Sequence, residues 1–437
     1  MEAININYLE EKFQELQLAD SESSLKNMRQ AGFQQFNNAG LPTFKNEEWK
    51  YTFISNLFKK EYALSNTGLQ NGLPENAINE IRLPGSENAN ELYFINGKFN
   101  SALSTIRSSA AQLTILPIEE ANDGEYGEIV KEHLNKSSLV IKDSIHALNT
   151  SFISGGLFIK INKNQVLEHP VYIYHILDAS ENHILAQPRS LVFVEESAKV
   201  QFVETYKTFG AMDSFTNEVF EIAVNNNAIV EYYKIQNDNS SASQVGTTHI
   251  RQIGKCFVHT VNVSLDGGMI RNNIDIIMEA EGNEGHMYGL YMIKDRTHVD
   301  NHTLVDNTMP NCYSNELYKG IIDGYATGVF SGKIFVRPDA QKTNAYQSNK
   351  NILLSETGTV NTKPQLEIFA DDVKCSHGCT IGQLDEEALY YLRTRGISQD
   401  NAKAMLLHAF AEDIVTQIKI EPVQNYVESL ILERLSV

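Results

Sequence analysis

Apolar positions follow different periods in different parts of the chain. Near the start, Leu9, Phe13 and Leu16 recur at helical spacing and predict an amphipathic helix. Residues 91–95 form a short apolar run before an Asn-Gly pair, which is typical of a strand entering a tight turn. Residues 1–150 are therefore predicted to form a mostly helical N-terminal domain.

The middle of the chain consists of short β-rich runs separated by turn residues. A small or polar corner followed by an apolar strand recurs at Ala198, Ala228, Cys256 and Gly285, at steps of about 30 residues. A unit of this length cannot bury its apolar face alone, but stacked units form a continuous core. The pattern therefore predicts a β-solenoid over residues 151–370.

Helical periodicity returns at the end of the chain. Asp385 and Ser398 stand where side-chain caps would begin two helices, and Gly396 fits a left-handed stop between them. Pro422 precedes a third segment with a narrow apolar stripe. Such a stripe can be intramolecular core or a docking surface for a partner, and the pattern leaves both open. Residues 371–437 are predicted to form a C-terminal helical domain.

Charge and composition narrow the choice of partners. The 437 residues include 55 acidic and 36 basic ones, for a net charge of −19. Phosphate backbones and anionic lipids would repel such a protein, so neither nucleic acid nor a membrane is expected as a partner. The start lacks the pattern of a secretion signal, and four cysteines are too few for a disulfide framework. A cytoplasmic protein is therefore predicted.

The most informative segment for chemistry carries Cys375, His377 and Cys379. Thiolate and imidazole together suit iron, zinc or copper. On a strand the three side chains would share one face, about 6.6 Å apart, and Gly378 would permit a bend that brings them together. Three ligands leave room for one from a partner or from sulfide. The alternative is structural: a buried cysteine and a hydrogen-bonded histidine.

Other motifs point away from an active site. His298 and His302 could share one ion on a helix, but their surroundings indicate a strand, which would set them about 13 Å apart. Residues 331–334 resemble a phosphate-binding loop but lack its first glycine and its Ser/Thr. We found no nucleophile elbow or convincing dinucleotide fingerprint. The chain is therefore expected not to be an enzyme, and any ATP is bound elsewhere.

Several segments resemble the SufB/SufD family of iron–sulfur cluster assembly proteins. Residues 363–378 are closely similar to the family signature, and the likeness continues through residues 380–410. Residues 40–43 and 48–52 are similar near the other end, and residues 315–320 in the middle, so the resemblance spans nearly the whole chain. The Lys-Cys-Ser-His-Gly form is more similar to the SufD branch than to the SufB branch.

The resemblance implies a mainly β protein, with a right-handed parallel β-helix between N-terminal and C-terminal helical domains. It also implies a non-catalytic scaffold that pairs with a SufB-like subunit through the β-helix and supports iron acquisition. No cofactor would be bound permanently; iron or an iron–sulfur cluster would be held transiently at the interface. Cys375 and His377 match the family's metal contacts. Cys379 stands where many relatives have a small residue, so its role as a ligand is in doubt.

A SufC-like ATPase would bind through the C-terminal helices, between Asp385 and Ile418. The expected contact residues in this segment are Asp385, Leu389, Tyr391, Arg393, Arg395, Gly396, Ala402, Met405, Leu406 and Phe410. Three alternatives stay open. The chain could be a SufB-type scaffold, it could form a homodimer in isolation, or it could be a β-helix enzyme acting on polysaccharide.

Overall fold

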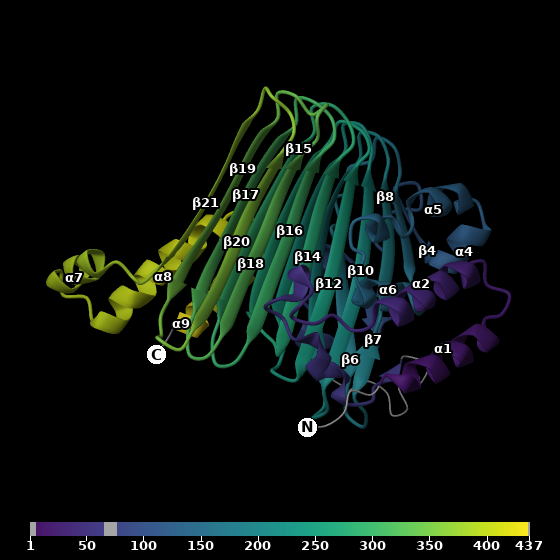
Figure 1. Ribbon diagram of the computed structural model, residues 1–437, viewed down its shortest axis with the longest axis horizontal. Coiled ribbons are helices and arrows are strands. Elements are labelled where there is room, and N and C mark those ends of the chain that lie inside the picture. The colour runs from purple at the N-terminus through teal and green to yellow at the C-terminus, as the bar shows by residue number, and fades with distance from the viewer. Residues whose placement is uncertain (1–5, 65–76, 436–437) are drawn as a thin grey trace.

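The computed structural model describes residues 6–64 and 77–435 (Figure 1). Helices and short strands come first in the chain. They are α1 (Asn7–Ala19), α2 (Lys26–Ala39), η1 (Glu47–Trp49), η2 (Ile54–Lys59), β1 (Ala63–Leu64), α3 (Ala77–Ile81), η3 (Ser86–Asn88), β2 (Asn90–Ile95), β3 (Lys98–Thr105), β4 (Leu113–Pro117), α4 (Ile118–Asp123), α5 (Gly127–His133), η4 (Lys136–Leu139) and α6 (Ser144–Ser151).

The described strands form two long sheets that face each other. The first has 11 strands: in spatial order β20 (Thr359–Ile368), β18 (Thr327–Val336), β16 (His298–Asn307), β14 (Met269–Met278), β12 (Ala242–Gln252), β10 (Ser214–Val224), β8 (Arg189–Val194), β5 (Leu157–Ile161) and β4, with β7 (Ile184–Ala186) and β1 beside them. The second has ten: β21 (Lys374–Gly382), β19 (Asn344–Leu353), β17 (Tyr313–Ile322), β15 (Glu284–Ile293), β13 (Phe257–Asp266), β11 (Ile229–Asn237), β9 (Lys199–Phe209), β6 (Val171–Asp178), β2 and β3.

The two sheets are the walls of a parallel β-solenoid, as the sequence predicted. Successive strands alternate between the sheets, and each solenoid strand pairs in parallel with the strand one coil later. The predicted corner residues stack directly, because the Ile229 amide donates to the Ala198 carbonyl and the Phe257 amide to the Ala228 carbonyl. The period of about 30 residues is thus one coil.

The interior of the solenoid has an apolar half and a polar half. On β9, Val200 and Phe202 join the main apolar core, whereas Glu204 lies among buried polar groups. On β10 the order is reversed, since Glu218 comes first and Phe220 is apolar core. Because the chain turns back between these strands, the polar positions of both sheets face each other along one side of the coil.

Helices cover part of the outer face of each sheet (Figure 1). The N-terminal helices pack on the 11-stranded sheet, where Leu9 and Phe13 join Phe215 of β10 in one buried cluster. The C-terminal helices are α7 (Glu386–Thr394), α8 (Gln399–Val415) and α9 (Glu421–Leu435). Helices α8 and α9 lie on the 10-stranded sheet, so the apolar stripe of the third segment, with Val427 and Ile431, is intramolecular core. Among the described helices, none has the length and apolar character to cross a membrane.

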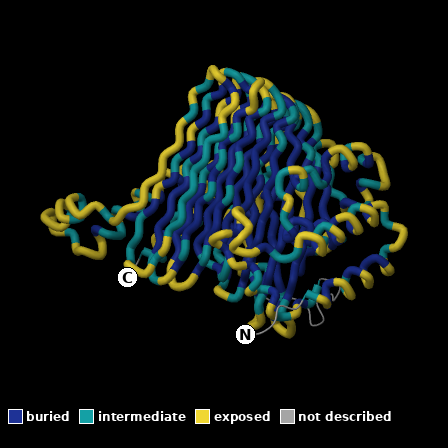
Figure 2. Tube along the Cα trace, viewed as in Figure 1, coloured by how far each residue is buried: buried dark blue, intermediate teal, exposed yellow. Residues whose placement is uncertain are grey.

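The two ends of the solenoid differ. At the first end, β3 and β4 pair antiparallel with β2 and β5 and finish the sheets. At the other end, β20 and β21 are the last strands of the two sheets. The trace of β21 is exposed over most of its length (Figure 2). The boundaries expected at 150/151 and 370/371 fall within the strand-paired body, because β2 to β4 precede the first and β21 follows the second.

Packing inside the coils is tight enough to test by one added methyl group. A β-carbon at Gly289 would lie 2.1 Å from Cε1 of Tyr318, so Gly289→Ala forces the ring or the strand to move. We expect it to lower the free energy of unfolding by about 1–3 kcal/mol. Gly378→Ala on β21 is the control, because its β-carbon would meet nothing within 4 Å. Equal denaturation midpoints for the two variants would contradict this packing.

Candidate metal centre

Strand β21 carries the predicted metal ligands on its inner face. Cys375, His377 and Cys379 pair with Ala345, Gln347 and Asn349 of β19, which are buried inside the solenoid. Because side chains alternate along a strand, residues in register point to the same side. The three soft donors therefore share one face, as expected, and that face is turned toward the interior.

No described strand covers this last coil. His377 and Cys379 are exposed, and Cys375 is half-buried against the end of the apolar core. On the opposite sheet, β20 presents inward positions such as Thr362 and Leu366, which are also only partly buried. The donors therefore lie at the open mouth of the solenoid and can be reached from outside.

The cysteines differ in burial and in their place along the solenoid. Burial raises the pKa of the Cys375 thiol above its ordinary value, against a smaller effect of a hydrogen bond with the Ala345 backbone. A thiol in this state favours its neutral form, so a metal ion or another positive charge would be needed to hold it as thiolate. Cys256 and Cys312 are buried at corners of the solenoid, and Cys312 immediately precedes β17, two strands before β21 in the same sheet.

Behind the mouth, the interior holds a carboxyl group that the sequence analysis did not single out. Gln347 Nε2 donates to Glu316 Oε2 at 2.7 Å, and both side chains are almost fully buried. Burial raises the pKa of Glu316 to about 7, although its hydrogen bond with Gln347 acts in the opposite direction. Glu316, Gln347 and His377 are successive members of one column of inward side chains.

A second cluster of possible ligands lies deep inside the solenoid. His175, Glu204 and Glu218 bring a ring nitrogen and two carboxylates close together. The Lys234 ammonium lies 2.8 Å from Glu218 and 3.1 Å from Glu204. Burial alone would lower the pKa of His175, but its hydrogen bonds with both glutamates raise it to about 9. Lysine and imidazolium thus stand where a cation would, so this is a buried ion cluster and not a metal site.

The only tryptophan packs against the outer face of the 11-stranded sheet. Trp49 is 1% exposed, its Nε1 donates to Asp143 at 3.0 Å, and the Arg271 guanidinium lies 4.0 Å from the ring centroid. Thr52 Oγ1 donates to Asp300 at 2.5 Å. The lone tryptophan therefore anchors the N-terminal segment to this sheet.

His298 and His302 take part in the contact between β16 and the segment that carries Trp49. Both project outward from β16: His298 Nε2 is 2.9 Å from Thr52 Oγ1, and His302 Nε2 is 2.9 Å from Asp300. His302 Nδ1 also lies 3.2 Å from Glu48. The two rings hold residues of the N-terminal segment, each through a different partner, and do not converge on one ion.

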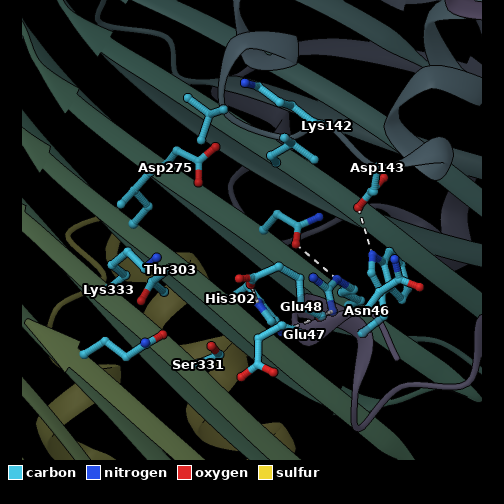
Figure 3. A pocket seen from close by; sticks show the side chains of 17 residues that line it. Asn46, Glu47, Glu48, Lys142, Asp143, Asp275, His302, Thr303, Ser331 and Lys333 are labelled. Carbon is cyan, nitrogen blue, oxygen red and sulfur yellow. Dashed lines mark hydrogen bonds and ion pairs between the residues drawn. The ribbon is translucent and has the colours of Figure 1, made fainter. Parts of the chain in front are cut away.

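A groove of about 430 Å³ lies beside this contact (Figure 3). We call residues 46–52, together with their contacts on β14 and β16, the tryptophan clasp. Residues 46–49 form one wall of the groove. Lys142, Lys333 of β18 and Gln365 of β20 also line the groove. Several of its charges are already paired, as Lys333 is with Glu367 at 2.9 Å. The groove therefore acts mainly as a cradle for the chain's own segment.

The expected ATPase contacts fall on two different surfaces. Helix α7 has no buried residue, and it extends away from the solenoid (Figure 1). Its cap is as predicted, since the Asp385 carboxylate accepts from two backbone amides, and Gly396 adopts a positive φ of 87° after it. The exposed members of the predicted set are Asp385, Tyr391, Arg393, Arg395, Gly396 and Met405.

The remaining predicted contacts pack at least partly within the chain. Leu389 and Leu406 are half-buried, and Ala402 is fully buried. The Lys319 ammonium of β17 lies 4.4 Å from the centroid of the Phe410 ring and donates to the Phe410 carbonyl. Helix α7 and the exposed residues that begin α8 are therefore the free part of this segment.

Family models match both the first part and the remainder of the chain. Residues 175–410 match the family model described as SUF system FeS cluster assembly, SufBD core domain, and residues 4–173 match the SufBD protein N-terminal region. An iron–sulfur cluster assembly SufBD family protein of Synechocystis is 31% identical over 416 residues, which are 92% of this chain and 90% of the relative.

Two further relatives carry a more specific name. The iron–sulfur cluster assembly protein SufD of Escherichia coli is 28% identical over 413 residues, covering 93% of this chain and 92% of the relative. SufD of Bacillus subtilis is 26% identical over 327 residues, covering 70% of each chain. The chain therefore belongs to the SufBD family of iron–sulfur cluster assembly proteins.

The stability of the tryptophan clasp should depend on pH. Burial alone would raise the pKa of Asp300, but His302 and Arg271 hold this pKa below its ordinary value of 3.8. Burial and Arg271 lower the pKa of His302, but Asp300 and Glu48 raise it above its ordinary 6.5. The aspartate therefore stabilises the clasp above pH 3.8 and less as the pH falls further. The histidine stabilises it below pH 6.5 and less as the pH rises through its raised pKa.

Fluorescence of the single tryptophan measures this dependence. We expect the most blue-shifted emission between pH 3.8 and 6.5 and a red shift on either side, as Trp49 becomes exposed. Asp300→Asn should shift the emission to the red within that window, because Arg271 and His302 lose their charged partner. Asp339→Asn, on an exposed turn, is the control. Emission that is the same in both variants at every pH would contradict this account.

Proposed function

We propose that this chain is a non-catalytic scaffold subunit of an iron–sulfur cluster assembly complex. Cys375 and His377 would hold iron or a nascent cluster for a time, and Cys379 is a third, doubtful donor. The observation that carries the proposal is that these donors lie at the uncovered end of the solenoid, where a second protein can reach them. The metal is cargo in this account, so nothing is bound permanently.

A SufB-like subunit is the proposed partner at the mouth. Strands β20 and β21 are the last in their sheets, so their outer backbone groups are available for pairing with another chain. A partner that continues the two sheets would cover the inward face of the last coil. It would also supply the ligands that three donors lack. A second copy of this chain is the competing occupant when the protein is isolated.

A SufC-like ATPase is the proposed partner of helix α7. Tyr390 and Tyr391 are 69% and 57% exposed, and aromatic side chains of this kind often carry the energy of an interface. Arg395 lies against the Tyr391 ring and adds a charged group to the same surface. We place the contact on α7 and the start of α8, because Phe410 already packs on the solenoid. ATP hydrolysis would then take place in the partner.

The proposal also covers the absence of catalysis and the cellular location. Relatives are named as assembly proteins, which supports a scaffold. The buried pair Glu204 and Glu218 is bonded to Lys234 and closed to a substrate, so it does not favour a carbohydrate-cleaving enzyme. The acidic composition and the few cysteines support a cytoplasmic location.

The metal centre is tested by removing its donors from a reconstituted complex with SufB-like and SufC-like partners. His377→Ala and Cys375→Ser should each lower the iron and sulfide recovered per complex by severalfold and leave the subunit ratio unchanged. Ser376→Ala is the matched control, since Ser376 lies between the two donors on the outer face of β21. Full iron and sulfide content in the double variant His377→Ala with Cys375→Ser would refute the site.

The proposed ATPase contact on helix α7 is tested by a binding measurement. Tyr391→Ala combined with Arg393→Ala should weaken binding of the SufC-like ATPase by about tenfold or more, because Tyr and Arg dominate interface energies. The melting temperature should not change, since neither side chain is buried. Tyr325→Ala, which removes a 64% exposed tyrosine from the turn after β17, is the control. Unchanged ATPase affinity in the variant with Tyr391→Ala and Arg393→Ala would show that the contact does not lie on helix α7.

A further inference from the structure

Three residues of the solenoid interior stand in one column that ends at the mouth. Glu316 of β17 pairs in register with Gln347 of β19, and Gln347 pairs with His377 of β21. Neighbouring strands lie about 4.8 Å apart, so each side chain lies within reach of the next. The column therefore joins a buried carboxyl group to the exposed imidazole.

The amide of Gln347 has a fixed donor and an unused acceptor. Its Nε2 donates to Glu316 at 2.7 Å, toward the interior. Its Oε1 is buried and accepts no hydrogen bond in the structure. An unsatisfied buried acceptor destabilises the folded chain, so its retention needs an explanation. Since Nε2 is the atom bonded to Glu316, Oε1 remains available to another donor.

The opposite sheet leaves room for this amide. A β-carbon at Gly332 of β18 would lie 2.5 Å from Gln347 Nε2, so any larger residue there would displace the side chain. Glycine at this position thus allows the amide to reach Glu316 and keep its orientation. The Glu316 carboxyl has an unpartnered oxygen of its own and is fully enclosed. Its burial without a cation is a second cost that packing alone does not explain.

The His377 ring, in turn, lacks a hydrogen-bond acceptor for its N–H within the part of the chain that the structure describes. Among the described residues, none forms a hydrogen bond with its ring. A histidine that binds a metal through one ring nitrogen almost always donates its other ring N–H to a carboxylate, a carbonyl oxygen or water. That partner fixes the orientation of the ring and raises its basicity. The residue paired in register with His377 is Gln347, and its Oε1 is an unused acceptor.

We propose that Gln347 is a positioning residue for His377: its Oε1 accepts the imidazole N–H while the other ring nitrogen binds iron, and Glu316 holds the amide in that orientation. This inference rests on the proposed function, because it assumes that His377 is a metal ligand. It adds two residues, Gln347 and Glu316, that support the ligand from inside the solenoid. All three residues belong to one chain, so this support for the ring does not need a residue from the partner.

The test measures cobalt(II) binding to the purified full-length chain, with Co²⁺ as a spectroscopic substitute for iron(II). Gln347→Met keeps the length of the side chain but removes the acceptor. We expect it to weaken Co²⁺ binding by about 10- to 100-fold, the usual effect of losing such a partner, and to alter the visible absorption of the bound ion. Lys350→Met is the matched control, because Lys350 is exposed on the outer face of the same strand.

A second pair of variants guards against a loss of folding. Glu316→Gln keeps an oxygen that can accept from Gln347 Nε2 and should bind Co²⁺ nearly as well as the original chain. Glu316→Met removes that acceptor and should weaken binding as Gln347→Met does. Thermal unfolding of each variant identifies any change in stability. If Glu316→Gln and Glu316→Met bind Co²⁺ equally, the proposed role of the carboxyl is wrong.

The double variant His377→Ala with Gln347→Met separates this inference from the proposed function. If Gln347 acts through His377, its replacement should have no further effect once the imidazole is gone. Fully additive losses, or normal Co²⁺ affinity in Gln347→Met, would overturn the inference while leaving His377 as a ligand. Unchanged Co²⁺ affinity in His377→Ala alone would instead refute the proposed metal centre.

Discussion

The parallel register of the stacked strands determines almost everything else in this structure. Each strand pairs with the strand one coil later, so a residue and its counterpart about 30 positions on share a side of the sheet. Columns of like side chains follow, apolar in one half of the interior and polar in the other. The candidate metal centre is the last member of such columns. Its donors face inward because every earlier residue in the column does.

Much of this arrangement could be predicted from the sequence, because it depends on local patterns. Corner residues such as Ala198 and Ala228 gave the coil length, alternation placed Cys375 and His377 on one face, and Asp385 indicated a helix cap. These features need only residues close in the chain or one regular period. The family resemblance then singled out Cys375 and His377 among the candidate ligands, and their role as ligands stays a prediction.

The remainder depends on contacts that no local pattern reveals. Trp49 packs on Arg271, which lies far along the chain, and nothing near either residue indicates the other. Lys234 and His175 pair with two buried glutamates that come from facing sheets, so a polar cluster that resembles a ligand set is an ion cluster. The Glu316–Gln347 pair could have been found by stepping back one coil at a time from His377, but only once the register was known.

The outer faces of both sheets are already used by the chain itself. The tryptophan clasp occupies one, and its Glu47 pairs with Lys363 on the last strand of that sheet. Helices α8 and α9 occupy the other. What is left open is the end of the stack, where two unprotected edges and the exposed donors His377 and Cys379 coincide. Copies of this chain synthesised in excess of their partner would present that end to any extended strand in the cell, so balanced production of the subunits becomes part of keeping the protein soluble.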